Sequence, residues 1–155
     1  MSEQRIAAIT LDERSVLRRS PEIESERAAA IADLLHENSF RPASGANGPF
    51  ELHLAVEENR LLIDIACTDG SRETIPLPLN SFRRIVKDYF VVCESYYDSV
   101  RRHNLNQVEA IDAGRRALHN EGAALLIEQL AGKVAIDHDT GRRLFTLICV
   151  LHLRA

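Results

Sequence analysis

Three stretches between residues 50 and 79 alternate apolar and polar side chains at every second position. Their apolar positions are Phe50, Leu52, Leu54 and Val56, then Leu61, Ile63, Ile65 and Cys67, then Ile75, Leu77 and Leu79. A period of two is typical of a half-buried β-strand, because successive side chains point to opposite faces. Glu58-Asn59 and Asp69-Gly70 separate the stretches, and Asp-Gly is a strong hairpin signal. The pattern predicts three consecutive antiparallel strands with one face on a core.

Two prolines interrupt the third stretch. Pro76 and Pro78 lie two residues apart, so their missing N–H groups fall on the same side of the strand. A central strand cannot lose two donors on one side, whereas an edge strand can turn that side to solvent. Residues 72–79 are therefore predicted to form a sheet edge.

Shorter signals mark the elements before this meander. Residues 5–11 predict a short strand. Ser20-Pro21-Glu22 predicts a helix start, since serine caps, proline suits the first turn and acids favour the helix dipole. An apolar stripe carries that helix to about residue 38, and residues 40–49, rich in Pro, Gly, Ser and Asn, predict a loop.

The chain after residue 80 has the periodicity of helices. Apolar side chains at steps of three and four predict one helix over 82–100. Asn106 and Glu109 resemble a capping box and predict a second helix that ends near Gly132. Gly114 and Gly122, eight residues apart, indicate close packing against a neighbouring helix. Asp137 or Asp139 is predicted to cap a last helix.

These elements follow the order β-α-β-β-β-α-α-α. We expect an α+β fold in which about four helices cover an antiparallel sheet of three to four strands. Residues 1–155 form a single globular domain on this interpretation, since no linker or repeat divides them. The last helix is apolar nearly all round, so residues 137–153 are expected in the middle of the core or in a homodimer interface.

Cysteine usage and hydropathy indicate the compartment. Cys67, Cys93 and Cys149 are odd in number, form no CxxC pair and lie in apolar stretches, which predicts reduced, buried thiols and a reducing, cytoplasmic environment. The first apolar run has six residues and the longest about ten, too few for a signal peptide or a membrane span. We expect no membrane partner.

The basic residues are 17 arginines and 2 lysines, and several arginines stand in doublets. Three doublets follow an aspartate, in the stretches 98–102, 112–116 and 139–143. One aspartate on a helix neutralises one arginine three or four residues later, which leaves the other guanidinium with spare donors. We expect a set of cationic side chains to converge on an acidic partner or a phosphate-bearing ligand: Arg83, Lys87, Arg115, His119 and Arg142. The alternative is a solvated face with inter-helix salt bridges to Glu94, Glu121 or Glu128.

Signatures of catalysis are scarce. The chain has no GxGxxG, Walker, HExxH or GxSxG motif, and residues 137–141 depart from a calcium loop in the place of glycine. We therefore expect no metal, no cofactor and no assigned catalytic residue. His119 is the weak candidate, as a general acid-base paired with Glu94 or Asp88. Nucleic acid is an unlikely partner, because residues 80–155 carry 11 basic and 9 acidic side chains, a balance of only +2.

Three stretches together resemble a known family. They are residues 82–90 (FRRIVKDYF), 109–122 (EAIDAGRRALHNEG) and 140–152 (TGRRLFTLICVLH). The chain resembles uncharacterised protein family 0262, small cytosolic proteins of alphaproteobacteria, over nearly its whole length. The resemblance implies a bacterial cytoplasmic origin and a stand-alone domain, and it implies no activity, substrate or catalytic residue.

These observations favour a non-enzymatic interaction or regulatory protein that binds its anionic partner through an arginine-rich helical face. The alternative is a small enzyme that acts on an anionic metabolite with His119 as general acid-base.

Overall fold

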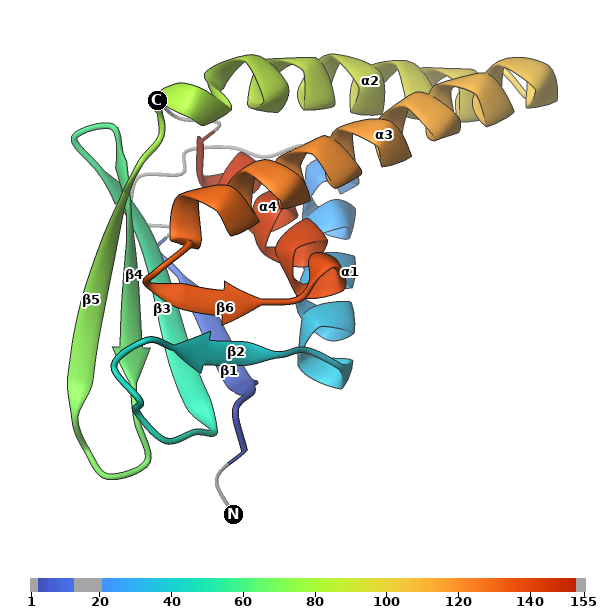
Figure 1. Ribbon diagram of the computed structural model, residues 1–155. Coiled ribbons are helices and arrows are strands. Elements are labelled where there is room, and N and C mark those ends of the chain that lie inside the picture. The colour runs from blue at the N-terminus through green and yellow to red at the C-terminus, as the bar shows by residue number, and fades with distance from the viewer. Residues whose placement is uncertain (1–2, 13–20, 153–155) are drawn as a thin grey trace.

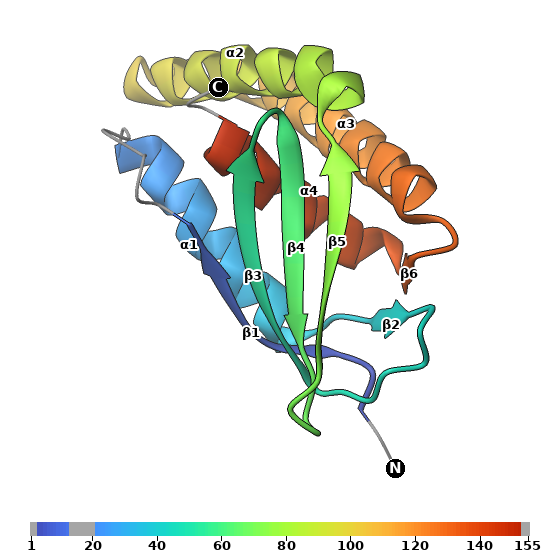
Figure 2. The same cartoon turned by 90° about the vertical axis from the view of Figure 1, so that its left-hand side faces the viewer.

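A four-stranded sheet forms one layer of the protein. The computed structural model describes residues 3–12 and 21–152. Strands β3 (Phe50–Glu57), β4 (Arg60–Ala66) and β5 (Arg72–Pro78) form the predicted antiparallel meander. At the first hairpin turn Glu58 and Asn59 both have positive φ, 51° and 62°, which matches the right-handed twist of the two strands. Figure 2 shows the meander face on.

The outer strands of the sheet differ in how well the sequence predicts them. The order is β1-β3-β4-β5, so the proline-bearing β5 lies at an edge, as predicted. Strand β1 (Ile6–Leu11) pairs with β3 in parallel, with Ile6 opposite Phe50 and Leu11 opposite Leu54. The α+β class is confirmed, but the expectation of a purely antiparallel sheet is wrong for β1. The helix that follows β1 carries the chain back to the starting end before β3 begins, and such a crossover makes the two strands parallel.

A second, two-stranded sheet was not predicted. Strand β2 (Phe40–Pro42) pairs antiparallel with β6 (Val134–Ile136). Residues 40–42 were expected in a loop. A strand of three residues is too short to show a period of two, so the pairing of these distant segments leaves no local signal.

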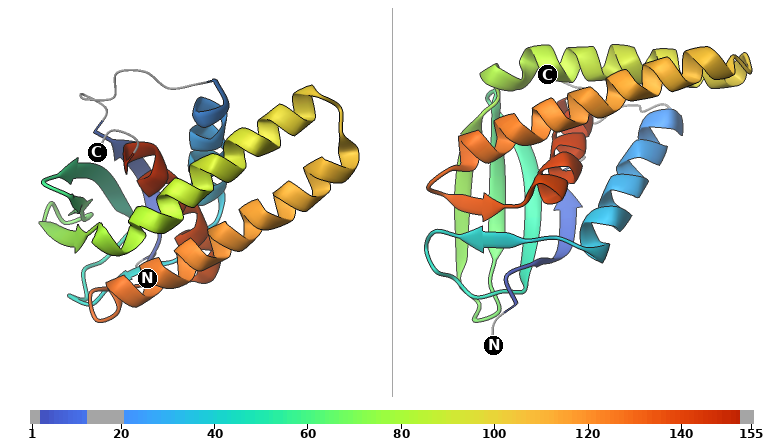
Figure 3. Two further views of the ribbon diagram at one scale, coloured as in Figure 1. Left: turned by 90° about the horizontal axis from the view of Figure 1, so that it is seen from above. Right: turned by 45° about the vertical axis from the view of Figure 1, so that its right-hand side comes forward.

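Helices cover one side of the sheet. They are α1 (Pro21–His36), α2 (Arg83–Arg101) after a short 3-10 turn η1 (Asn80–Phe82), α3 (Leu105–Leu130) and α4 (His138–His152). Helices α2 and α3 run antiparallel across the top of Figure 1, and their far ends project beyond the sheet (Figures 1 and 3). No helix among the residues placed here has both the length and the apolar character to cross a membrane.

The observed helix caps agree in part with the caps predicted from the sequence. The predicted cap at Ser20 lies outside the described residues. Asp137 caps α4, where its Oδ1 accepts from the N–H of Thr140 at 2.8 Å. The predicted start of α3 at Asn106 is wrong, because Asn104 is the cap and accepts from the N–H of Gln107 at 3.2 Å. Two asparagines lie two residues apart, and only the first has the extended ψ of 88° that a cap adopts.

Helix α4 is the centre of the core. Residues 144–151 are all buried, with α4 packed against α1 and α3 on one side and facing β3 on the other. Its apolar character is thus accounted for within one chain, and a homodimer through residues 137–153 stays a prediction. Cys93 and Cys149 are buried free thiols, as predicted, and Cys67 is half-buried.

Helix α3 approaches α4 closely at a glycine. A Cβ on Gly122 would lie 2.5 Å from ring atoms of Phe145, whereas a Cβ on Gly114 would meet nothing within 4 Å. The prediction of close helix packing is therefore confirmed at Gly122 and wrong at Gly114, which is exposed.

Candidate functional site

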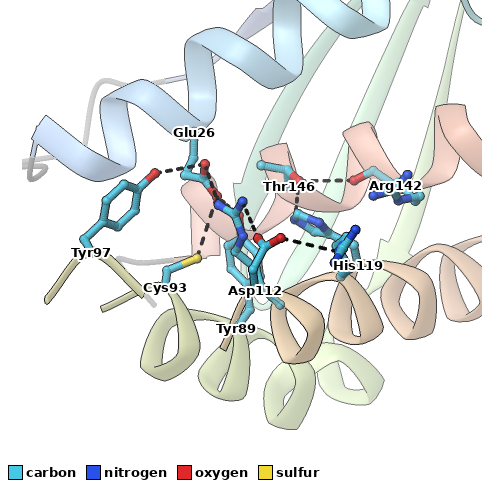
Figure 4. A network of polar contacts seen from close by, with 10 residues as sticks. Glu26, Tyr89, Cys93, Tyr97, Asp112, His119, Arg142 and Thr146 are labelled. Atoms are coloured by element: carbon cyan, nitrogen blue, oxygen red, sulfur yellow. Dashed lines mark hydrogen bonds and ion pairs between the residues drawn. The ribbon is translucent and has the colours of Figure 1, made fainter. Parts of the chain in front are cut away.

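A polar pocket lies where α1, α3 and α4 meet. Its volume is about 220 Å³. The lining residues come from one face of each helix: Glu26, Ala29, Ala30 and Asp33 from α1, Arg115 and His119 from α3, and Arg142, Arg143 and Thr146 from α4. Within each set, residues three or four positions apart lie on a common helix face: 26, 30 and 33 on α1, 115 and 119 on α3, and 142 and 146 on α4. Figure 4 shows the polar contacts around the pocket.

The structure brings together three of the five cationic residues that the sequence singled out. Arg115, His119 and Arg142 line the pocket. Arg83 and Lys87 are exposed on α2 and do not line it. Helix α2 turns its other face inward, with Tyr89 buried beneath the pocket, so these two side chains point away. The single cluster of five is not formed.

Arg115 is held by carboxylates. Its Nη1 lies 3.2 Å from Glu26 Oε1, its Nη2 lies 3.0 Å from Asp112 Oδ1, and the guanidinium carbon lies 4.4 Å from the centroid of the Tyr96 ring. Burial of the side chain, 19% exposed, opposes its charge. Glu26 and Asp112 outweigh that burial and raise the pKa of Arg115 above its ordinary value. Arg115 is thus mostly a structural cation.

Glu26 is the residue that the sequence analysis missed. Its carboxylate accepts from the hydroxyl of Tyr89 at 2.6 Å and of Tyr97 at 3.1 Å, besides binding Arg115. The Cys93 thiol lies 3.7 Å from the same carboxylate. Figure 4 shows these groups converging from α2 and α3 on one side chain of α1. The spacing of residues 89, 93 and 97 places their polar tips on one helix face, and that was the available signal.

The groups around Glu26 stay protonated. Burial, followed by Cys93 and Glu26, raises the pKa of Tyr89 far above its usual range. Burial, followed by Glu26, also raises the pKa of Tyr97. Burial raises the pKa of the Cys93 thiol to about 12. All three therefore act as hydrogen-bond donors to a carboxylate and not as nucleophiles.

At two of the three doublets the aspartate contacts both arginines, whereas the sequence predicted one. Asp112 contacts both Arg115 and Arg116, at 3.0 and 3.5 Å. Asp98 likewise reaches both of its arginines, at 3.9 and 3.3 Å. Only at Asp139 is one arginine left over, because Arg143 donates to the backbone oxygen of residue 139 and to no carboxylate of the described chain. Of the three carboxylates proposed for inter-helix bridges, Glu121 binds Arg84.

Arg142 keeps unused donors. Its Nη1 lies 3.7 Å from Asp139 Oδ1, too far for a hydrogen bond, and the side chain is 32% exposed. The Nε atoms of Arg142 and Arg115 are both buried, and neither has a hydrogen-bond partner among the described residues. A buried N–H without an acceptor costs about 1–3 kcal/mol, more where the group is charged.

His119 is a neutral donor in the same pocket. Its Nε2 lies 3.3 Å from Thr146 Oγ1, and that hydroxyl donates to the backbone oxygen of Arg142 at 3.2 Å. Because the hydroxyl proton is used there, the oxygen accepts from Nε2–H, which leaves Nδ1 as the acceptor of the ring. Burial first, and then the positive charge of Arg142, lowers the pKa of His119 to about 4.

Comparisons with known proteins place this α+β chain among bacterial proteins of one family. Residues 3–154 match the model of the family described as "Uncharacterised protein family (UPF0262)". The chain belongs to that family, which confirms the resemblance. A UPF0262 protein of Rhodospirillum rubrum is 58% identical over 147 residues, covering 94% of this chain and 91% of the relative.

Two further relatives are similar over nearly their whole length. A UPF0262 protein of Rhodopseudomonas palustris is 54% identical over 152 residues, covering 97% of this chain and 93% of the relative. One of Paramagnetospirillum magneticum is 51% identical over 152 residues, covering 97% of each. No solved structure matches the chain. The names of these relatives indicate no specific function.

Proposed function

We propose that this protein is a non-enzymatic binding protein for a small phosphate-bearing ligand, held in the pocket between α1, α3 and α4. One observation carries the proposal: Arg142 lines the pocket with its guanidinium partly exposed and without a hydrogen bond to a carboxylate of the described residues. An oxyanion supplies several acceptor oxygens at once and pairs with a guanidinium through charge-assisted hydrogen bonds.

The charged side chains that line the pocket favour an anionic ligand. Arg115 is neutralised by its two carboxylates, so the available cations are Arg142 and Arg143. Neutral His119 and the Thr146 hydroxyl add polar atoms without adding charge. Two guanidiniums on adjacent residues of α4 can address different oxygens of one phosphate.

The size of the pocket favours a small ligand over an acidic protein surface. Its volume of about 220 Å³ lies below the ~300–1,000 Å³ common for drug-sized ligands. A metabolite with one phosphate group fits that space. The predicted acidic protein partner would need an exposed cationic face, and the exposed Arg83 and Lys87 lie apart from this pocket.

The test is a calorimetric titration of inorganic phosphate and of ethyl phosphate. Arg142→Gln should weaken binding by about 10- to 100-fold, because hydrogen bonds to charged groups contribute about 1.5–3 kcal/mol. Arg83→Gln removes the same charge outside the pocket and is the matched control, expected to bind as the wild type does. Arg115 is a poor choice for the test, since its ion pairs hold α1 to α3.

Equal weakening in the two variants would mean a general charge effect and would overturn the proposal. Failure of the wild-type protein to bind either phosphate probe would do the same. Thermal unfolding of each variant, measured in parallel, separates lost binding from lost folding.

A second candidate function is catalysis on an anionic metabolite with His119 as general acid-base. The observation that favours it is a cleft that holds His119, the carboxylates of Glu26 and Asp33, and two guanidiniums. An imidazole with a pKa of about 4 is neutral at physiological pH and can accept a proton there. Turnover of small phosphate esters, followed by phosphorus NMR and lost in His119→Gln, would support this function. Binding without turnover would leave the first proposal standing.

Two further parts of the proposal concern context. We propose a cytoplasmic location, supported by three free cysteines in a chain whose described residues include no disulfide. We also keep the homodimer through residues 137–153 as a proposal, for which light scattering at several concentrations is the direct measurement.

A further inference from the structure

A second, smaller space between α1 and α4 adjoins the proposed phosphate pocket. This space has a volume of about 90 Å³ and shares Asp33 and Arg143 with the larger pocket. Its other lining residues are His36 and Glu37 of α1 and Asp137 and Asp139 at the start of α4. The two spaces therefore adjoin between these helices, and we refer to them together as the cleft.

The formal charge changes sign along this cleft. The larger space has three arginines against two carboxylates, a balance of +1 with His119 neutral. The smaller one has four carboxylates against one arginine, a balance of −3 with His36 counted as neutral. Asp33 and Arg143 stand at the boundary.

Asp33 is the carboxylate that lines both spaces and is free to bind a ligand. Within residues 3–12 and 21–152 its side chain makes no hydrogen bond and no ion pair, and it lines both spaces. The other carboxylate of the larger pocket, Glu26, is already used by Arg115, Tyr89 and Tyr97. Asp33 would repel a purely anionic ligand. A ligand that also carries a positive charge would instead be attracted to it.

We infer that the ligand carries a cationic amine as well as its phosphate, and that Asp33 binds the amine. This inference rests on the proposed function, because it takes the phosphate to lie against Arg142 and Arg143. A zwitterion of the aminoalkyl phosphate class spans the boundary with its anionic end toward α3 and its ammonium group toward the acidic end of the cleft. A primary ammonium suits that end, since it donates three hydrogen bonds and carboxylates only accept.

A metal ion is a less suitable occupant of the acidic end. In the part of the chain that the structure describes, no three His, Cys, Asp or Glu side chains are placed to hold one. Asp33 with the other carboxylates of the smaller space fits an ammonium group, which needs no fixed set of ligands.

The experiment compares two probes that differ only in the amine: O-phosphoethanolamine and ethyl phosphate. The wild-type protein should bind O-phosphoethanolamine about fivefold more tightly, the size expected for a partly exposed ion pair. Asp33→Asn should remove this preference while it keeps or increases the affinity for ethyl phosphate. Glu128→Gln, which removes an exposed carboxylate of α3 outside the cleft, is the matched control and should keep the preference.

The outcomes separate this inference from the proposed function. Ethyl phosphate bound as tightly as O-phosphoethanolamine would overturn the role of Asp33 and leave the phosphate site intact. A preference for the amine that survives Asp33→Asn would also overturn it. If the wild type binds neither probe, the phosphate site itself is wrong.

Discussion

Acidification should destabilise this protein through one histidine. His119 is half-buried and its ring contacts Tyr89 of α2. The charged groups that act on it are Arg115 and Asp112 on its own helix, Glu26 from α1 and Arg142 from α4. Burial and the charge of Arg142 lower its folded-state pKa from the ordinary 6.5 to about 4. The unfolded chain therefore takes up a proton at a higher pH than the folded chain does.

The magnitude follows from that difference in pKa. Above pH 6.5 the histidine is neutral in both states, and its contribution to stability is fully present. As the pH falls toward about 4 the unfolded state gains the proton first, so the free energy of unfolding decreases. Since one pKa unit is worth about 1.4 kcal/mol, the full loss is about 3 kcal/mol.

The assay is urea unfolding followed by circular dichroism at pH 7, 6, 5 and 4.5 for the wild type and His119→Gln. The free energy of unfolding of the wild type should fall more steeply between pH 6.5 and 4.5, while glutamine removes this part of the slope. His103→Gln, in the exposed turn between α2 and α3 and outside both spaces of the cleft, is the matched control and should keep the wild-type slope. Identical slopes for the wild type and His119→Gln would refute the assignment of a buried neutral imidazole.

Two pairs of substitutions test the local packing and capping. Gly122→Ala should lower stability by about 1–3 kcal/mol because the new Cβ meets the ring of Phe145, while Gly114→Ala, in open space, should raise it by up to about 1 kcal/mol. Thermal unfolding that moves both variants in the same direction would contradict the close approach of α3 and α4. Asn104→Ala should cost about 1 kcal/mol as a lost helix cap, and Asn106→Ala much less. Equal losses at the two asparagines would show that the cap is misplaced.

The sequence predicts the elements of this fold better than their partners. The meander, its tight turns and its proline edge follow from a period of two and from the backbone chemistry of Pro76 and Pro78, which are local properties. The parallel pairing of β1 and the small β2–β6 sheet depend on segments far apart in the chain. No local pattern records such pairings, so the sequence could not supply them.

The candidate site likewise has residues that local patterns reveal and residues that only the tertiary structure reveals. Arg115, His119 and Arg142 could be selected because doublets and helical spacing are visible in the sequence. Glu26 could not, because its partners Tyr89, Tyr97 and Arg115 lie 63, 71 and 89 residues away on other helices. Arg83 was grouped with Arg115, His119 and Arg142 because the sequence shows its charge. The direction in which its side chain points depends on how α2 packs, which the sequence does not show.

The parallel strand at the start of the chain also has a consequence for biosynthesis. Ile6 pairs with Phe50, so β1 leaves the ribosome about 44 residues before its partner (50 − 6). The three strands of the meander need only short hairpins and can assemble as they emerge, since local contacts form faster than distant ones. Strand β1 is thus made before the meander but pairs after it, and until then the edge of β3 that β1 covers stays open to other chains.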